Sequence, residues 1–126
     1  MKLLLLWISF GYLALADFEV LVSSNSKLKH VSAKEIADLF LGKTTKIQGY
    51  RVIPLDNKKC YRDFYKKVVH KNTKQLRDYW IREMYKGNRV PPRKLSEQQI
   101  KLLMKKNNNY ITYSYSSKGK TVFKIH

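Results

Sequence analysis

The chain has little negative charge and almost no cysteine. Its 126 residues include 9 Asp and Glu against 26 Lys and Arg, which gives a formal net charge of +17 at pH 7. The single cysteine, Cys60, excludes an internal disulfide, and no Asn-x-Ser/Thr sequon occurs. Stability must therefore come from packing, and the excess of positive charge favours anionic partners.

Long apolar runs are confined to the N-terminus. Residues 1–16, MKLLLLWISFGYLALA, contain one cation, an apolar run and small residues at Ala14 and Ala16. This pattern predicts a secretory signal peptide. The run is too short, and too soon followed by Asp17, for a membrane span, which needs roughly 20 residues; an uncleaved anchor is the alternative. Cleavage would leave residues 17–126 as one exported domain.

The order of strand and helix patterns predicts an α/β fold with a small mixed sheet and about four helices. Apolar runs rich in β-branched and aromatic residues predict strands at 18–22, 51–55 and 110–115, and another at 121–125 after a turn at Gly119. Segment 44–50 is expected to form a turn or short hairpin. The alternation of these elements favours an α/β domain over a helix bundle.

Capping signals and apolar spacing predict where the helices begin and which faces they bury. The expected helices start at the N-cap residues Ser32, Thr73 and Ser96, with a further helix over 61–70. Pro91 and Pro92 predict an extended linker. The residues expected on the buried faces of the second and third helices are Tyr61, Phe64, Tyr65, Val68, Val69, Leu76, Tyr79, Trp80, Ile81 and Met84.

The reactive side chains argue against catalysis. His30, His70 and His126 fall in a loop, at a helix end and at the terminus, and their spacing predicts neither a metal site nor a catalytic triad. Cys60 has no evident partner base, so it is interpreted as a buried or incidental thiol, with an intermolecular disulfide as the alternative. We expect no enzyme activity, no cofactor and no metal site.

Residues 58–106 form the most basic part of the chain, with 16 Lys and Arg against 4 Asp and Glu. Six aromatic residues lie among these charges, a mixture that is also found in nucleic-acid-binding proteins. The aromatic residues fall at helical core spacing, however, which favours a core with a solvated basic face. Nucleic-acid binding is therefore the weaker hypothesis, and the predicted export signal disfavours it further.

The junction LDNKKCYRDFY, residues 55–65, passes from the second expected strand into the second expected helix. Amide groups at a helix start and the positive end of the helix dipole attract anions. Arg62 lies in the first turn of this expected helix and can hold a phosphate or carboxylate by two parallel hydrogen bonds. The alternative is that Asp56 or Asn57 caps the helix and the lysines remain in water, and the residues alone do not decide between the two.

Several short segments occur in an order that resembles a known family. They are LFLGK at 39–43, Pro-x-Asp at 54–56, Arg62 with Phe64 and Tyr65, LRDYW at 76–80, YKGNRVPP at 85–92 and Ile-x-Tyr at 111–113. Together they resemble the short phosphate ABC transporter substrate-binding-like proteins of bacteria, which are similar to one lobe of the periplasmic phosphate-binding proteins. The resemblance extends over nearly the whole chain after the predicted signal, without a single decisive motif.

The resemblance implies a single periplasmic-binding-protein-like lobe that holds an oxyanion with backbone amides, hydroxyls and an arginine. By position, Arg62 matches the family's arginine, and Ser24 and Asn25 match the polar turn after the first strand. Lys58 and Lys59 stand where family members have a Gly-Ser pair, and these lysines would supply charge instead. The predicted ligand site therefore consists of these five residues.

The resemblance also implies a function and a compartment. We expect a periplasmic, non-enzymatic protein that binds phosphate or another small oxyanion, or assists its uptake or sensing. One lobe leaves its ligand open to water, so a second copy or a periplasmic partner protein is expected to matter. The alternative is an interaction module of the same fold that has lost the ligand and binds an acidic protein, an anionic membrane surface or a polyanion through its basic face.

Overall fold

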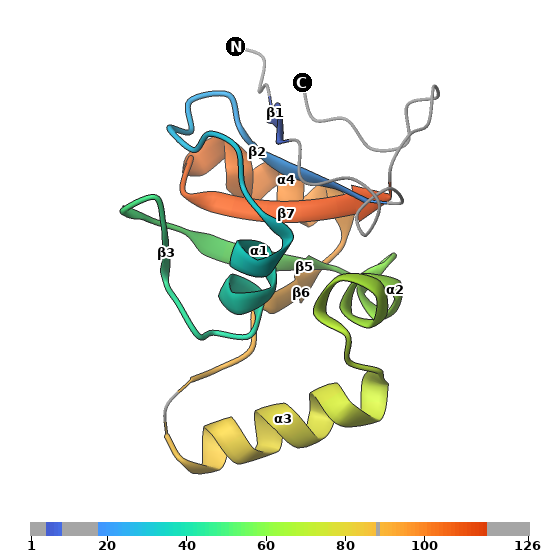
Figure 1. The fold of residues 1–126 in the computed structure, drawn as a ribbon. Coiled ribbons are helices and arrows are strands. Elements are labelled where there is room, and N and C mark those ends of the chain that lie inside the picture. Colours follow the sequence, from blue (N-terminus) through green and yellow to red (C-terminus); the bar gives the residue numbers. More distant parts are fainter. Residues whose placement is uncertain (1–4, 9–17, 88, 116–126) are drawn as a thin grey trace.

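A mixed β-sheet forms the centre of the fold (Figure 1). The computed structural model describes residues 5–8, 18–87 and 89–115. Within them the sheet has five strands, in the spatial order β1 (Leu5–Ile8), β2 (Phe18–Ser23), β7 (Tyr110–Tyr115), β5 (Ile53–Asn57) and β6 (Arg93–Leu95). Strand β2 is antiparallel to β1 and β7, whereas β7, β5 and β6 run parallel. The predicted α/β class with a small mixed sheet is confirmed.

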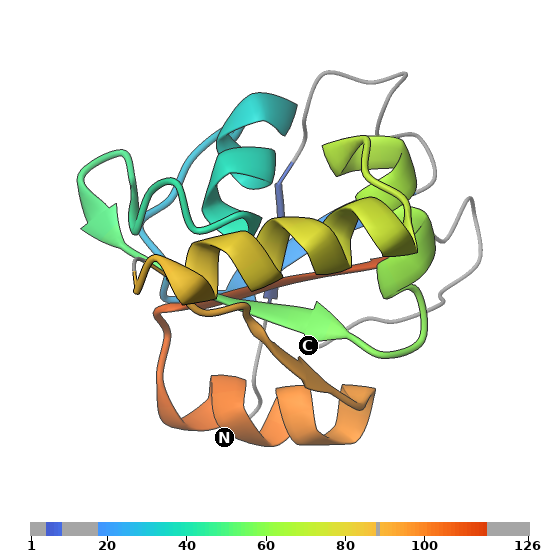
Figure 2. The same cartoon turned by 90° about the horizontal axis from the view of Figure 1, so that it is seen from below.

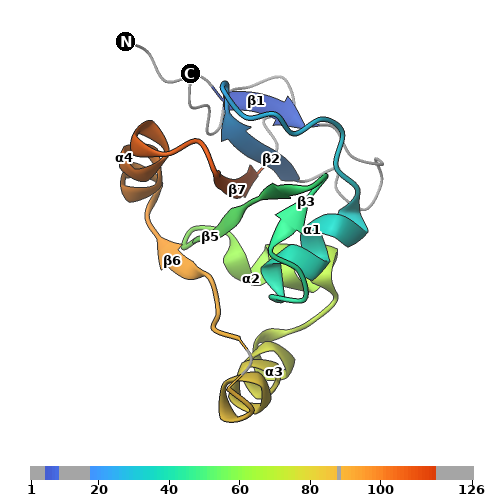
Figure 3. The ribbon, with the colours of Figure 1, turned by 90° about the vertical axis from the view of Figure 1, so that its left-hand side faces the viewer.

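Helices cover both faces of this sheet. One face carries α1 (Ala33–Phe40), α2 (Tyr61–Phe64) and the π-helical turn η2 (Tyr65–Val69), and α4 (Glu97–Lys106) covers the other, as Figure 3 shows. Helix α3 (Thr73–Tyr85) lies at the end of the molecule farthest from β1 (Figure 1).

A small hairpin of β3 (Lys46–Ile47) and β4 (Tyr50–Arg51) confirms the turn expected after α1. Its two central residues, Gln48 and Gly49, both have positive φ, at 55° and 83°. Positive φ at both central positions is the requirement of a type I′ two-residue hairpin turn, which the glycine meets without strain.

Strand β2 is buried at all six positions, and four of them, Phe18, Val20, Leu21 and Val22, are apolar, because both of its faces are covered. Val20 and Val22 belong to the larger core cluster beneath α1 and α2. Leu21 points the other way and packs with Ile100 and Met104 of α4. This two-sided burial explains why the run FEVLV shows no alternation of polar and apolar residues, and its predicted burial is confirmed.

Aromatic rings fill the larger core. Phe64 is fully buried and stacks on the ring of Tyr113, with the ring centroids 3.6 Å apart. It also makes edge-on contacts with Phe18, Phe40 and Tyr65, at centroid distances of 5.3 to 5.7 Å. The ring of Phe64 thus joins β2, α1, η2 and β7 around α2.

Reciprocal capping boxes begin the three longer helices. The predicted boxes at Ser32 and Ser96 are confirmed. The prediction of Thr73 as the N-cap of α3 is wrong by one residue. Asn72 is the N-cap, because its side chain accepts from the backbone amide of Gln75 at 2.8 Å and the Gln75 side chain accepts in return from the Asn72 amide.

Two segments between the helices differ from the prediction. The expected continuous helix over 61–70 is a four-residue α2 followed by η2, which His70 closes in the left-handed conformation with φ of 64°. The linker after Pro91 and Pro92 leads directly into β6, which pairs with β5 and sets Lys94 opposite Asp56. A three-residue strand with two cations has no apolar alternation, so only its pairing with β5 identifies it.

The N-terminal segment joins the sheet. Strand β1 lies within the predicted signal peptide, and its Leu6 pairs with Val22 of β2. The signal peptide stays a prediction, and cleavage would leave the outer edge of β2 unpaired. None of the described helices has the length and apolar character needed to cross a membrane. The predicted strand at 121–125 and its turn at Gly119 lie outside the described residues.

Gly42, predicted to stop the first helix, follows the C-cap of α1 with φ of 72°. A Cβ atom there would lie 3.1 Å from Cδ of Arg89. We expect Gly42→Ala to lower the free energy of unfolding by about 1–2 kcal/mol through backbone strain, and further through this contact. Gly49→Ala is the matched control in urea denaturation, since its φ is 83° but no described atom lies within 4 Å of the added Cβ. Equal losses in both variants would show that the contact with Arg89 contributes nothing.

Candidate anion-binding site

A cluster of cations lies where β5 ends and α2 begins. Lys58, Lys59 and Arg62 are exposed and line an open hollow of about 430 Å³. The rest of its lining comes from Cys60, Tyr61, Asp63 and Tyr115. The structure therefore brings three of the five predicted ligand residues together.

Ser24 and Asn25 lie elsewhere. They follow β2, which runs antiparallel to β7, whereas β5 runs parallel to β7. The end of β2 and the start of β5 therefore lie at the same end of the sheet, on either side of β7, and Lys58 lies at the opposite end. Asn25 lines a separate hollow of about 190 Å³ with residues that include Arg51 and Asn109. The prediction of one site formed by all five residues needs this correction, because it depended on strand directions that the sequence did not reveal.

Strand β6 adds a cation that the sequence analysis missed. The Nζ atom of Lys94 lies 3.7 Å from the centroid of the Tyr61 ring, a cation–π contact. Hydrogen bonds from Arg62 and Lys94 lower the pKa of the Tyr61 hydroxyl. The proline pair at 91 and 92 favours extended backbone before β6 but does not indicate that β6 pairs with β5, and this pairing brings Lys94 to Tyr61.

The backbone amides before α2 are used within the protein. The amide of Lys58 donates to the carbonyl of Leu95 at 3.0 Å, and that of Cys60 donates to the carbonyl of Asn57 at 3.2 Å. The amide of Lys59 donates to Oδ1 of Asn57 at 2.9 Å. Asn57 thus accepts from two of these amides and Leu95 from the third, and the cationic side chains remain as the groups that can bind an anion.

Asp56 turns into the core instead of capping α2. Its Oδ1 accepts from the hydroxyl of Tyr113 at 2.8 Å, and its Oδ2 accepts from the hydroxyl of Tyr65 at 3.0 Å. Burial raises the pKa of Asp56 to about 7, although both hydrogen bonds and the charge of Lys94 act in the lowering direction. Burial also raises the pKa of each tyrosine well above its usual value. All three residues are buried and none of them lines the hollow, so this network is not open to a ligand.

One carboxylate faces the hollow. Asp63 accepts a hydrogen bond from the hydroxyl of Tyr115 at 2.6 Å. This bond raises the pKa of Tyr115 to about 12. The hollow therefore carries three cationic side chains against one carboxylate that already has a hydrogen-bond partner.

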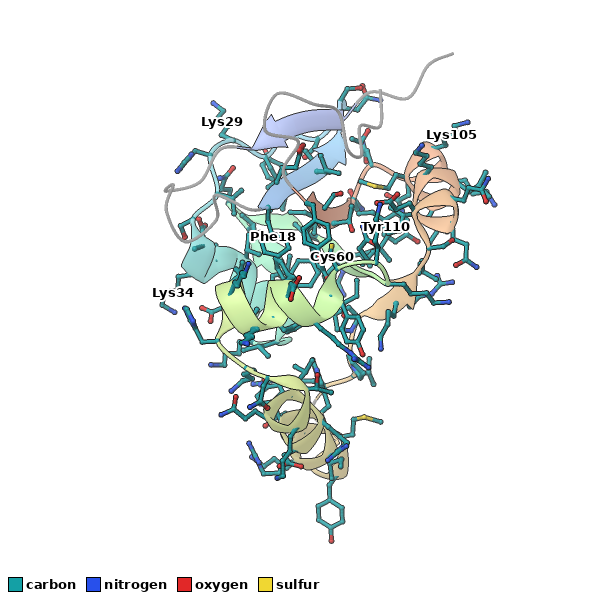
Figure 4. All side chains as sticks on the ribbon, turned by 90° about the vertical axis from the view of Figure 1, so that its right-hand side faces the viewer. Phe18, Lys29, Lys34, Cys60, Lys105 and Tyr110 are labelled. Atoms are coloured by element: carbon teal, nitrogen blue, oxygen red, sulfur yellow. The ribbon has the colours of Figure 1, made fainter. Side chains whose placement is uncertain are left out.

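Cys60 lies in the core, between the sheet and the helices (Figure 4). Burial and the nearby charges of Glu97 and Asp63 raise the pKa of its thiol to about 12, so the thiol is protonated at neutral pH. This agrees with the interpretation of an incidental buried cysteine and leaves little access for an intermolecular disulfide. Across the described segments, no group of three or more His, Cys, Asp and Glu side chains is arranged to hold a metal ion.

Comparison with known proteins gives no match. No protein-family model matches the chain, and neither a curated protein nor a solved structure does. The resemblance to phosphate-binding proteins therefore stays a prediction.

Proposed function

We propose that the hollow at the end of β5 binds a small oxyanion such as phosphate. The observation that supports this proposal is the convergence of Lys58, Lys59 and Arg62 on one open hollow, with Lys94 beside it. The guanidinium of Arg62 can present two parallel N–H donors to an oxyanion, and the lysines add point charges. In this proposal the protein is exported to the periplasm, is not an enzyme, and binds the anion itself or assists its uptake or sensing.

The open shape of the hollow limits the affinity that we expect. Three neighbouring backbone amides are already bonded within the protein, and water reaches the cations. Charge-driven binding in such a place corresponds to a Kd of about 1 mM at low salt. A second copy or a partner protein that covers the open side would exclude water and strengthen binding.

The proposal is tested by calorimetric titration with phosphate and with sulfate at low ionic strength. Because a hydrogen-bonded charge pair contributes about 1.5–3 kcal/mol, Arg62→Ala is expected to weaken binding about tenfold or more. Arg51→Ala is the matched control, since Arg51 is also exposed but lies at the other end of the sheet. Absence of binding by both anions, or equal effects of the two variants, would contradict the proposal.

A second candidate function is the interaction module, which binds a polyanionic partner through its basic face. It is favoured by the filled amides of Lys58, Lys59 and Cys60, which remove the main-chain donors that a selective phosphate site uses. Repeating the measurements at rising salt separates the two functions. Binding of poly-glutamate through a broad basic face falls steeply with salt, whereas binding of one small anion in the hollow falls gradually.

A further inference from the structure

Helix α3 carries an apolar strip on its outward side, formed by Ile81, Met84 and Tyr85. The sequence predicted Ile81 and Met84 in the core beside Tyr79 and Trp80. The structure corrects this, because the three residues of the strip are 60%, 53% and 93% exposed while Tyr79 and Trp80 are buried. Spacing of i, i+3 and i+4 places the strip along one side of the helix.

The inner side of α3 is already fixed to the rest of the protein. The hydroxyl of Tyr79 donates to the carbonyl of Leu41 at 2.6 Å and accepts from Arg89 at 2.8 Å. Buried Glu83 forms ion pairs with Arg89 at 3.2 Å and Lys86 at 3.6 Å. Since these bonds define which side of α3 faces inward, the strip is a fixed outer surface.

The strip is surrounded by positive charge. Arg77 and Arg82 are exposed on α3, as is Lys74 in its first turn. The helix has two acidic residues, of which Glu83 is buried and Asp78 pairs with Lys74 at 2.9 Å. A partner of this surface must therefore carry negative charge and also offer an apolar region in which the side chains of the strip can be buried.

The position of α3 suits a broad, flat partner. Seen along the direction of Figure 2, α3 lies in front of the sheet and no other described element covers it. Four of the seven large apolar side chains exposed in the described residues fall within ten positions, because Val90, 75% exposed, follows the strip in sequence. A projecting helix of this kind can lie along a planar surface without the rest of the protein intervening.

We propose that α3 lies on an anionic lipid surface, with Ile81, Met84 and Tyr85 among the headgroups and Arg77 and Arg82 against lipid phosphates. Interfacial helices bind in this way, through an apolar side that enters the headgroup region and cations that meet anionic lipid. The proposal specifies the partner of the second candidate function and does not depend on the oxyanion hollow.

Vesicle sedimentation of the full chain tests this proposal with two matched variants. Ile81→Ser and Leu102→Ser each remove an exposed aliphatic side chain, 60% and 59% exposed, and Leu102 lies on α4 near Lys105 and Lys106. On vesicles of equal parts phosphatidylglycerol and phosphatidylcholine, we expect Ile81→Ser to weaken binding about tenfold and Leu102→Ser to leave it unchanged. The N-terminal apolar segment is the same in both variants, so any contribution that it makes to vesicle binding does not affect the difference between them.

Three results would overturn the proposal: equal binding by the two variants, equal binding to vesicles of phosphatidylcholine alone, or an Ile81-dependent binding to poly-glutamate with none to vesicles. The last result would assign the strip to an acidic protein. Circular dichroism of both variants checks that they remain folded. Arg62→Ala, which tests the hollow, is expected to leave the effect of Ile81→Ser unchanged, so failure of one proposal can be distinguished from failure of the other.

Discussion

Replacement of Phe64 by Ala is expected to lower the free energy of unfolding by about 3–5 kcal/mol. The ring is fully buried and stacks on Tyr113 while its edges meet Phe18, Phe40 and Tyr65. These neighbours belong to separate strands and helices that other contacts hold in place, so the cavity cannot close easily. Since domains of this size are stable by about 5–15 kcal/mol, the variant would retain only a part of its stability.

Urea denaturation followed by tryptophan fluorescence measures this loss. Tyr61→Ala is the control, because Tyr61 lies in the same short helix but is only half-buried, with Lys94 over its ring. We expect the control to lose about 1 kcal/mol, mainly from the cation–π contact. A loss for Phe64→Ala that is no larger than that of the control would show that the aromatic cluster does not hold α1, α2 and η2 against the sheet.

The elements that the sequence predicts well are those whose signals are local. The capping boxes at Ser32 and Ser96 lie within four residues of chain, and both mark helix starts correctly. The run 18–22 is apolar at nearly every position, which requires cover on both faces, and the structure provides it. The grouping of Lys58, Lys59 and Arg62 follows in the same way from their proximity in the chain.

The elements that the sequence misses depend on distant partners. Strand β6 exists through its pairing with β5, and only that pairing brings Lys94 to Tyr61 and Asp56. The separation of Ser24 from Arg62 results from the direction of β2, which a short apolar run does not encode. Likewise, the apolar residues of α3 are spread around much of the helix circumference, and the sequence does not indicate which of them face the core.

Asp56→Asn is expected to become more stable relative to the wild type as the pH rises. Burial raises the pKa of Asp56 from 3.8 to about 7, so between these values the folded protein holds a proton that the unfolded chain has lost. Stability from this group is therefore complete below about pH 4 and is lost as the pH rises to 7. This change in pKa corresponds to a loss of roughly 4 kcal/mol in the free energy of unfolding between these pH values.

The difference in unfolding free energy between the variant and the wild type isolates this effect. Asparagine keeps the size of the side chain and can still hydrogen-bond both Tyr65 and Tyr113, so the fold is retained without the titration. Asp78→Asn is the control, since Asp78 is a surface residue whose pKa the Lys74 hydrogen bond lowers, and its pH dependence has the opposite sign and is small. Urea denaturation at pH 4 and pH 8 measures the free energy of unfolding of the wild type and both variants. If the difference in unfolding free energy between the wild type and Asp56→Asn were the same at both pH values, Asp56 would be ionised in the core throughout. The hydrogen bonds from the two tyrosines and the charge of Lys94 would then lower its pKa by more than burial raises it.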